Sequence, residues 1–138
     1  MNKKELAEKL HKKGYNCAQS VACAFCEEVN LPEELLFKLN EGFGFGFGCG
    51  KSACGALSAA IMLLGLKHST ANLSAPNSKA ATYKIGAAFT EVFKSRTGSI
   101  ICEEIKGSKN GKPLCLCDKC ISIGVEIFEE YLRALEKA

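Results

Sequence analysis

Residues 53–66, ACGALSAAIMLLGL, are apolar on every side of a helix except at Ser58. A helix that is apolar all round belongs in the interior of a protein, and this one is too short to span a bilayer. Its small residues, which let neighbouring helices approach closely, are Gly55, Ala56, Ala59 and Ala60. We therefore predict a central, buried helix over residues 53–66, capped by Ser52.

The segments on either side have the spacing of amphipathic helices. They predict helices over residues 3–13, 17–29, 32–39, 81–95, 100–106 and 118–135. Asn16, Ser99 and Asp118 are suitable caps for three of these helices, and Gly14 suits the end of the first. No alternating stretch is long enough to require a sheet. We expect an all-α fold, a compact bundle of about five to seven helices forming one domain over residues 1–138.

Composition narrows the function classes. The chain has 138 residues, 47% of them hydrophobic, which is enough to bury a core without disulfides or metal. The net charge of +3 is mild, and no basic stripe is interleaved with aromatic residues, so nucleic-acid binding is not indicated. The charged N-terminal segment does not resemble a secretory signal. We expect a soluble, cytoplasmic protein that does not insert into membranes.

Nine cysteines are an odd number, and in a reducing compartment they are better explained as ligands or redox thiols than as structural disulfides. Four of them, Cys17, Cys54, Cys102 and Cys120, fall in the first turn of four different predicted helices. The free N–H groups at a helix start stabilise a thiolate, the form that binds metal or attacks disulfides. These four cysteines are therefore expected to converge on one site.

Three kinds of site fit this convergence: an iron–sulfur cluster, a zinc ion held by four thiolates, or thiol pairs that cycle to disulfides without metal. Cys117 and Cys120 form a C-x-x-C, which suits either a redox pair or two ligands to one metal. The candidate metal ligands are Cys17, Cys49, Cys54, Cys102, Cys117 and Cys120. We interpret Cys23 and Cys26 as small buried side chains, and His11 and His68 as surface groups.

The glycine run before the central helix, GFGFGFGCGKS at residues 42–52, is not a phosphate-binding loop, because Phe45 stands where that motif needs its first glycine. In an extended segment the phenylalanines would share one side and bury in the core. The glycine side would let backbone N–H groups approach sulfur closely. The run is thus predicted to form one wall of the cysteine site.

Four segments follow one another along the chain: GYNCAQSV at 14–21, the stretch from the glycine run to Ser69, GSIICEEIKG at 98–107 and CLCDKCISIGVEI at 115–127. Together they resemble the C_GCAxxG_C_C family of redox-active small proteins. The resemblance implies that the family cysteines are Cys17, Cys54, Cys102 and Cys120. The glycine that closes the family's CGA-x-x-G motif is Ala59 here.

The resemblance also implies a redox partner protein, and an association with transporters, since family members are often encoded beside transporter genes. A related domain occurs in split-Soret cytochromes with haem and an iron–sulfur centre, which favours a cluster. Covalent haem attachment is not supported, because the chain has no C-x-x-C-H.

The leading hypothesis is an electron carrier with a cysteine-ligated iron–sulfur centre. The alternatives are a thiol–disulfide oxidoreductase that uses Cys117 and Cys120, and a zinc-stabilised module that binds a partner. The basic loop at residues 106–112 is most simply a solvated surface, although it would also suit an acidic redox partner. The apolar last helix leaves room for a homodimer.

Overall fold

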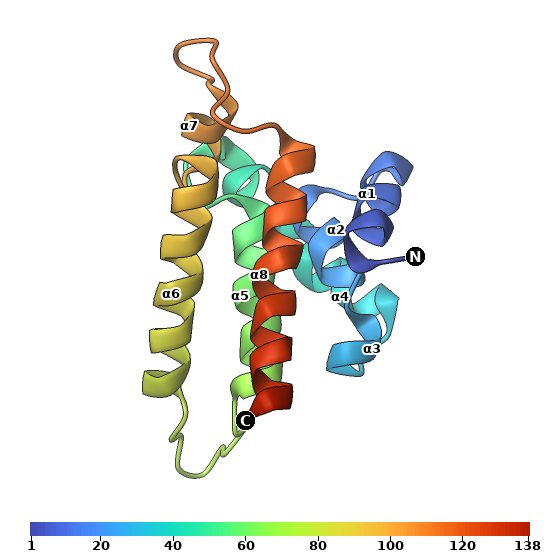
Figure 1. The fold of residues 1–138 in the computed structure, drawn as a ribbon, viewed down its shortest axis with the longest axis vertical. Coiled ribbons are helices and arrows are strands. Elements are labelled where there is room, and N and C mark those ends of the chain that lie inside the picture. The colour runs from blue at the N-terminus through green and yellow to red at the C-terminus, as the bar shows by residue number, and fades with distance from the viewer.

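The computed structural model describes residues 1–138 and contains eight α-helices and no β-strand, which confirms the all-α prediction (Figure 1). Two irregular turns, η1 (Glu41–Phe43) and η2 (Gly46–Gly50), lie between the fourth and fifth helices. The α-helices are α1 (Lys3–Lys13), α2 (Cys17–Cys23), α3 (Cys26–Val29), α4 (Glu33–Asn40), α5 (Gly55–His68), α6 (Lys79–Thr97), α7 (Cys102–Lys106) and α8 (Cys117–Lys137). None of them combines the length and the apolar character that crossing a lipid bilayer requires.

The central apolar helix is confirmed as α5, although it begins at Gly55 and ends at His68. It contacts α2, α6 and α8, and these four helices supply most of the core. Gly124 of α8 lies directly against α5, since a Cβ there would stand 2.9 Å from the Ala56 carbonyl oxygen. Small residues on both helices therefore bring α5 and α8 into close contact, as Figure 1 shows.

The first two helices begin where the sequence predicts. The Asn16 side chain accepts a hydrogen bond from the Gln19 N–H at 2.8 Å, and the Gln19 side chain accepts one from the Asn16 N–H at 3.0 Å. Gly14 ends α1 in the left-handed region with φ of 117°. This capping box fixes where α2 begins.

The single helix predicted over residues 17–29 is wrong, because the chain breaks it at Ala24 and Phe25. Phe25 leaves helical geometry with φ of −116° and ψ of 26°. Its ring is fully buried and meets Phe128 edge to face at 4.8 Å between centroids. The break coincides with this tertiary contact, and it raises the number of α-helices to eight instead of five to seven.

The caps predicted for α5, α7 and α8 are also wrong. The caps of α5 and α7 lie two residues later than predicted, at Cys54 and Ile101, and the cap of α8 lies two residues earlier, at Leu116. An isolated antiparallel bridge between Ala53 and Ile101 holds the chain extended at both positions. That pairing delays the start of α5 and α7 beyond Ser52 and Ser99.

The extended conformation predicted for the glycine run is wrong as well. Phe45 and Phe47 lie in the left-handed region, with φ of 53° and 63°, and both rings are about half exposed. Of the three phenylalanines, only Phe43 packs against the core. Gly46 also has positive φ, and a Cβ there would stand 2.6 Å from Cys102 Cβ, so a glycine lets the coiled loop press against α7.

Candidate functional site

The starts of α2, α5, α7 and α8 surround one cavity of about 190 Å³. The starts of α7 and α8 lie toward the top of Figure 1. Five cysteines, which include the four that the sequence analysis placed together, line the cavity. The lining residues are His11, Asn16, Cys17, Phe45, Cys54, Cys102, Ile105, Lys106, Cys117 and Cys120. The added fifth sulfur is Cys117, the first residue of α8.

Backbone hydrogen bonds hold two of these cysteines in place. The Cys54 N–H donates to the Ile100 carbonyl oxygen at 2.7 Å, and the Cys102 N–H donates to the Ser52 carbonyl oxygen at 2.9 Å. The two bonds flank the bridge between residues 53 and 101. They tie the start of α5 to the start of α7, so that Cys54 and Cys102 face the same cavity.

Cys17 is held by contact with α5. Its sulfur lies against Gly55, where an added Cβ would stand only 2.5 Å from Sγ and 2.9 Å from the Phe43 carbonyl oxygen. Any larger residue at position 55 would push Cys17 or the backbone away. The glycine next to Cys54 therefore allows Cys17 to approach.

The buried thiols strongly affect one another. Hydrogen bonding with the Cys54 thiol, followed by burial, raises the pKa of Cys17 well above its ordinary range. Interaction with the Cys120 thiol raises the pKa of Cys54 to about 12, although Cys17 and the Ala56 N–H act in the opposite direction. At neutral pH these thiols are therefore protonated, unless a cation or cluster displaces the protons.

Backbone N–H groups also point at sulfur. The N–H groups of Phe45 and Ala18 lower the pKa of Cys17 against the larger effects that raise it. The left-handed loop thus brings the Phe45 N–H to sulfur, as predicted for the glycine run, although through a coiled and not an extended backbone. Burial raises the pKa of Cys102, and the nearby Lys106 ammonium lowers it.

The remaining cysteines lie outside the cavity. Cys49 is exposed, and its thiol donates to the Gly46 carbonyl oxygen at 3.5 Å. Cys115 is half-buried against the core, just before α8. Cys23 is buried beside Leu10, in agreement with its interpretation as a small core side chain, while Cys26 is half-buried at the start of α3.

His11 lines the cavity, although the sequence analysis assigned it to the surface. Its Nδ1 lies 3.1 Å from Asp118 Oδ1, which joins α1 to the first turn of α8. Ala7 and Leu10 are both buried, so a position four residues after Ala7 borders the packed face of α1. That spacing is the signal that could have found it. His68 instead contacts Thr82 through Nδ1, at 2.8 Å.

No carboxylate lines the cavity, and its donors are five thiols with one imidazole. Sulfur donors select zinc, copper(I) or iron–sulfur centres over magnesium and calcium. No three of the histidine, cysteine and acidic side chains stand close enough together to hold a single metal ion. The cavity is also much larger than the roughly 10–15 Å³ that one water molecule needs.

The sequence model of one family, described as "Putative redox-active protein (C_GCAxxG_C_C)", matches residues 15–131. The chain belongs to the C_GCAxxG_C_C family. The matched residues include all five cavity cysteines. Searches of curated proteins and of solved structures found no match. Membership supports a redox role in general.

Proposed function

We propose that the protein transfers electrons through an iron–sulfur cluster held by cysteines of this cavity. The observation that carries the proposal is the convergence of five cysteines from the starts of four helices on one cavity without a carboxylate. The family's redox character agrees with it.

The donor set and the size of the space favour a cluster over a single ion. A single zinc ion needs its thiolate sulfurs about 2.3 Å from the metal. No three donor side chains of the cavity stand close enough together to meet that requirement. A cluster spreads its ligands over a wider space. The N–H groups aimed at Cys17 and Cys54 stabilise anionic sulfur, which also tunes a cluster's potential.

Four cysteines, Cys17, Cys54, Cys102 and Cys120, are the proposed ligands, and Cys117 is able to replace Cys17. The bound cluster would accept and release one electron at a time. Phe45 and Ile105 form apolar walls that limit the access of water. Cys49 could serve as a ligand only after the loop at residues 46–50 moves, because its thiol points to the Gly46 carbonyl.

Anaerobic purification tests the proposal. We expect brown protein with charge-transfer absorption, and iron and sulfide in matching amounts. Cys54→Ser and Cys120→Ser should lose the colour, whereas Cys26→Ser, outside the cavity, should keep it. Colourless wild-type protein without iron would reject the cluster, and stoichiometric zinc in the same sample would support the zinc-stabilised module.

The second candidate function is thiol–disulfide exchange by Cys117 and Cys120. Both line the cavity one turn apart on α8, and Cys117 is half-buried while Cys120 is buried. Cys117 would attack an incoming disulfide, and Cys120 would then displace the mixed disulfide. The pair becomes a disulfide, and the two electrons and two protons leave as two thiols of the partner. Turnover of a disulfide substrate that survives in Cys120→Ser would reject this function.

A further inference from the structure

Three large apolar side chains are exposed around the opening of the cysteine cavity. Phe45 lines the cavity and is half exposed. Leu114 is joined to the cavity residue Ile105 by a backbone hydrogen bond of 2.8 Å, and Leu116 directly precedes Cys117. Exposed apolar side chains are ordinary one at a time. Here Phe45 lies at the cavity itself, and Leu114 and Leu116 belong to the exposed segment that leads into Cys117, so apolar side chains are exposed on the segments next to the cavity.

The segments that carry these side chains, residues 45–51 and 103–119, form what we call the mouth surface. It has five lysines and three carboxylates, which are Lys51, Lys106, Lys109, Lys112, Lys119, Glu103, Glu104 and Asp118. Each carboxylate is already engaged. Their partners are Lys109 for Glu103, the Ser99 hydroxyl for Glu104 and His11 for Asp118.

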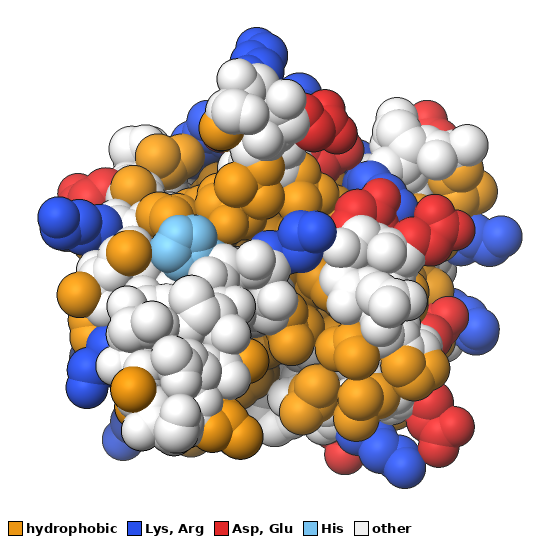
Figure 2. Space-filling model, turned by 90° about the horizontal axis from the view of Figure 1, so that it is seen from below, with side chains coloured by type: hydrophobic (Ala, Val, Ile, Leu, Met, Phe, Trp, Pro, Cys, Tyr) orange, Lys and Arg blue, Asp and Glu red, His pale blue; other side chains and the backbone are white.

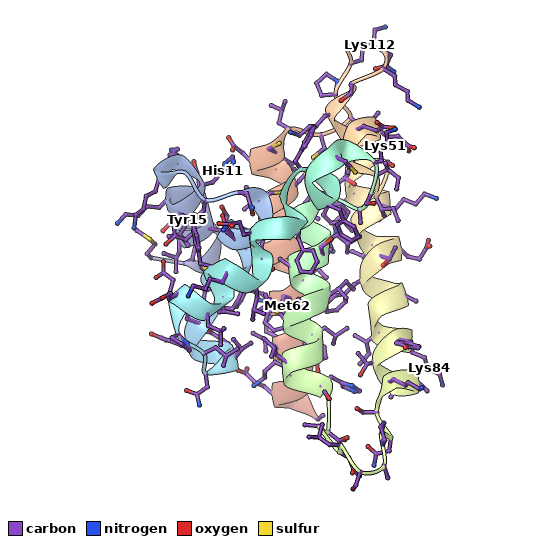
Figure 3. The ribbon with its side chains drawn as sticks, turned by 180° about the vertical axis from the view of Figure 1, so that it is seen from behind. His11, Tyr15, Lys51, Met62, Lys84 and Lys112 are labelled. Carbon is purple, nitrogen blue, oxygen red and sulfur yellow. The ribbon has the colours of Figure 1, made fainter.

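Several lysines of the mouth surface have no carboxylate partner. Lys51 and Lys112 are exposed and form no ion pair, and both stand at the upper end of the molecule in Figure 3. The Lys106 ammonium lies 4.8 Å from the centre of the Phe45 ring, so a positive charge sits on the apolar rim itself. The mouth surface therefore combines exposed apolar side chains with unpaired positive charge.

Lysines without an ion pair also lie at the opposite end, among them Lys67, Lys79 and Lys84, so free positive charge alone does not distinguish the mouth surface. Figure 2 shows that face, with lysine or arginine and acidic side chains scattered around its edge. Farther along α8, the acids Glu126 and Glu130 are paired with Lys4 and Arg96. What distinguishes the mouth surface is that its free lysines lie next to the cavity thiols, with Lys106 lining the cavity itself.

We propose that the mouth surface docks an acidic electron-transfer protein, an inference that rests on the redox function proposed above. Electron-transfer complexes are small and transient, and their association is steered by complementary charge more than by buried area. An acidic patch on the partner would face the free lysines, while its apolar centre would cover Phe45, Leu114 and Leu116. Electrons would then pass over a short distance between the two centres.

Small redox probes of opposite charge test the steering. Anaerobically reduced protein is mixed with anionic ferricyanide or with cationic hexaammineruthenium(III), each of which takes up one electron. We expect ferricyanide to react faster at low ionic strength and to slow as salt is added. Lys51→Glu and Lys112→Glu should each slow ferricyanide by roughly 3- to 10-fold at low salt. They should accelerate the cation.

Lys84→Glu is the matched control, because it makes the same charge change on α6 at the far end of the molecule (Figure 3). It should leave both rates unchanged. Equal effects of Lys84→Glu and Lys112→Glu would show that only net charge matters and would overturn the proposal. Faster reaction of the cation with wild-type protein would also overturn it.

A second arm needs no bound cluster. The anionic aromatic disulfide DTNB and the cationic disulfide cystamine each react with accessible cavity thiols such as Cys117. The same lysine variants should slow DTNB and leave cystamine unchanged or faster. If the protein proves colourless but the variants behave in this way, the cluster fails while the surface stands. If the protein is coloured but the Lys51 and Lys112 variants leave its reaction rates unchanged, the cluster stands and the docking surface is rejected.

The protein partner is tested with an acidic plant-type ferredoxin as the probe. Amide shifts of the labelled protein should change at residues 45–51 and 103–119, and these changes should be lost in Lys112→Glu. Shifts spread over α6, or binding of DNA or anionic vesicles in place of the ferredoxin, would overturn the assignment.

Discussion

Gly55 sets how closely α2 approaches α5, since its missing side chain leaves room for the Cys17 sulfur. We predict that Gly55→Ala lowers the free energy of unfolding by roughly 1–3 kcal/mol, because the new methyl group would also meet the Phe43 carbonyl and cannot be relieved by a side-chain rotation alone. Urea denaturation measures the change, and loss of the bound centre should accompany it.

Gly65→Ala is the matched control on the same helix. No atom lies within 4 Å of the position that its Cβ would take. A glycine-to-alanine change in a helix interior stabilises by roughly 0.5–1 kcal/mol. The prediction is wrong if the two variants shift stability in the same direction.

The Cys54 thiol gives the metal-free protein a pH dependence. Contact with Cys120 raises its pKa from the ordinary 9.0 to about 12, so the folded state holds this proton more tightly than the unfolded state. The resulting stability is complete below pH 9 and is lost as the pH rises toward 12. One pH unit above the ordinary thiol pKa, the loss is about 1.4 kcal/mol for each such thiol.

Urea midpoints of the metal-free protein, measured at neutral pH and at one pH unit above the ordinary thiol pKa, test this loss of stability. Cys54→Ala lacks one titrating thiol, so its stability should fall less over the same interval. Identical losses in the wild type and in Cys54→Ala would show that the lysines or tyrosines, and not this thiol, set the alkaline limit.

The capping box before α2 positions a whole element, because Asn16 both starts the helix and donates from Nδ2 to the Glu41 carbonyl oxygen at 3.0 Å. Asn16→Ala should cost about 1 kcal/mol from the cap alone. It should also loosen Cys17, the next residue. Faster alkylation of Cys17 in the metal-free protein, measured by mass spectrometry, would report this movement.

Asn2→Ala makes the same substitution at the same kind of cap on α1, where the box with Glu5 is exposed. It should cost a similar or smaller amount of stability and leave the Cys17 alkylation rate unchanged. If both variants accelerate alkylation equally, the effect is general fraying and not positioning.

The elements show what local sequence can decide. The helices at residues 3–13 and around residues 53–66 follow from caps and apolar pattern, and both are observed. The break at Phe25 and the late starts of α5 and α7 depend on Phe128 and on the bridge from Ala53 to Ile101, which are distant in sequence. The positive φ angles of Phe45 and Phe47 could not be predicted from the sequence either, because non-glycine residues rarely adopt them.

At the scale of the whole molecule, the sequence predicted which cysteines meet at the cavity, but not which other residues line it. Helix starts placed Cys17, Cys54, Cys102 and Cys120 together, and the structure gathers them in one cavity. His11 and Lys106 reach it only through the packing of α1 on α8 and the fold of α7 against the glycine loop. Lys106 follows from three-dimensional packing that no local pattern encodes, whereas for His11 its spacing from buried Ala7 on α1 was the one local signal.

One consequence concerns the stability of the entire bundle. A group bound by cysteines of α2, α5, α7 and α8 would cross-link elements that are far apart in sequence, so its binding energy would add to folding stability. We predict that removal of the centre lowers the thermal midpoint but leaves most of the helical circular dichroism, since the main core contains many side chains that lie outside the cavity.

Hydrogen exchange locates the effect. After removal of the centre, amide protection should fall at the starts of α2, α5, α7 and α8, while the middle of α6, anchored by Phe89 and Phe93, should change little. Cys26→Ser, which lies outside the cavity, should respond to removal as the wild type does. A uniform loss of protection, including α6, would contradict the prediction, because it would mean that the centre supports the whole core and not only the helix starts around it.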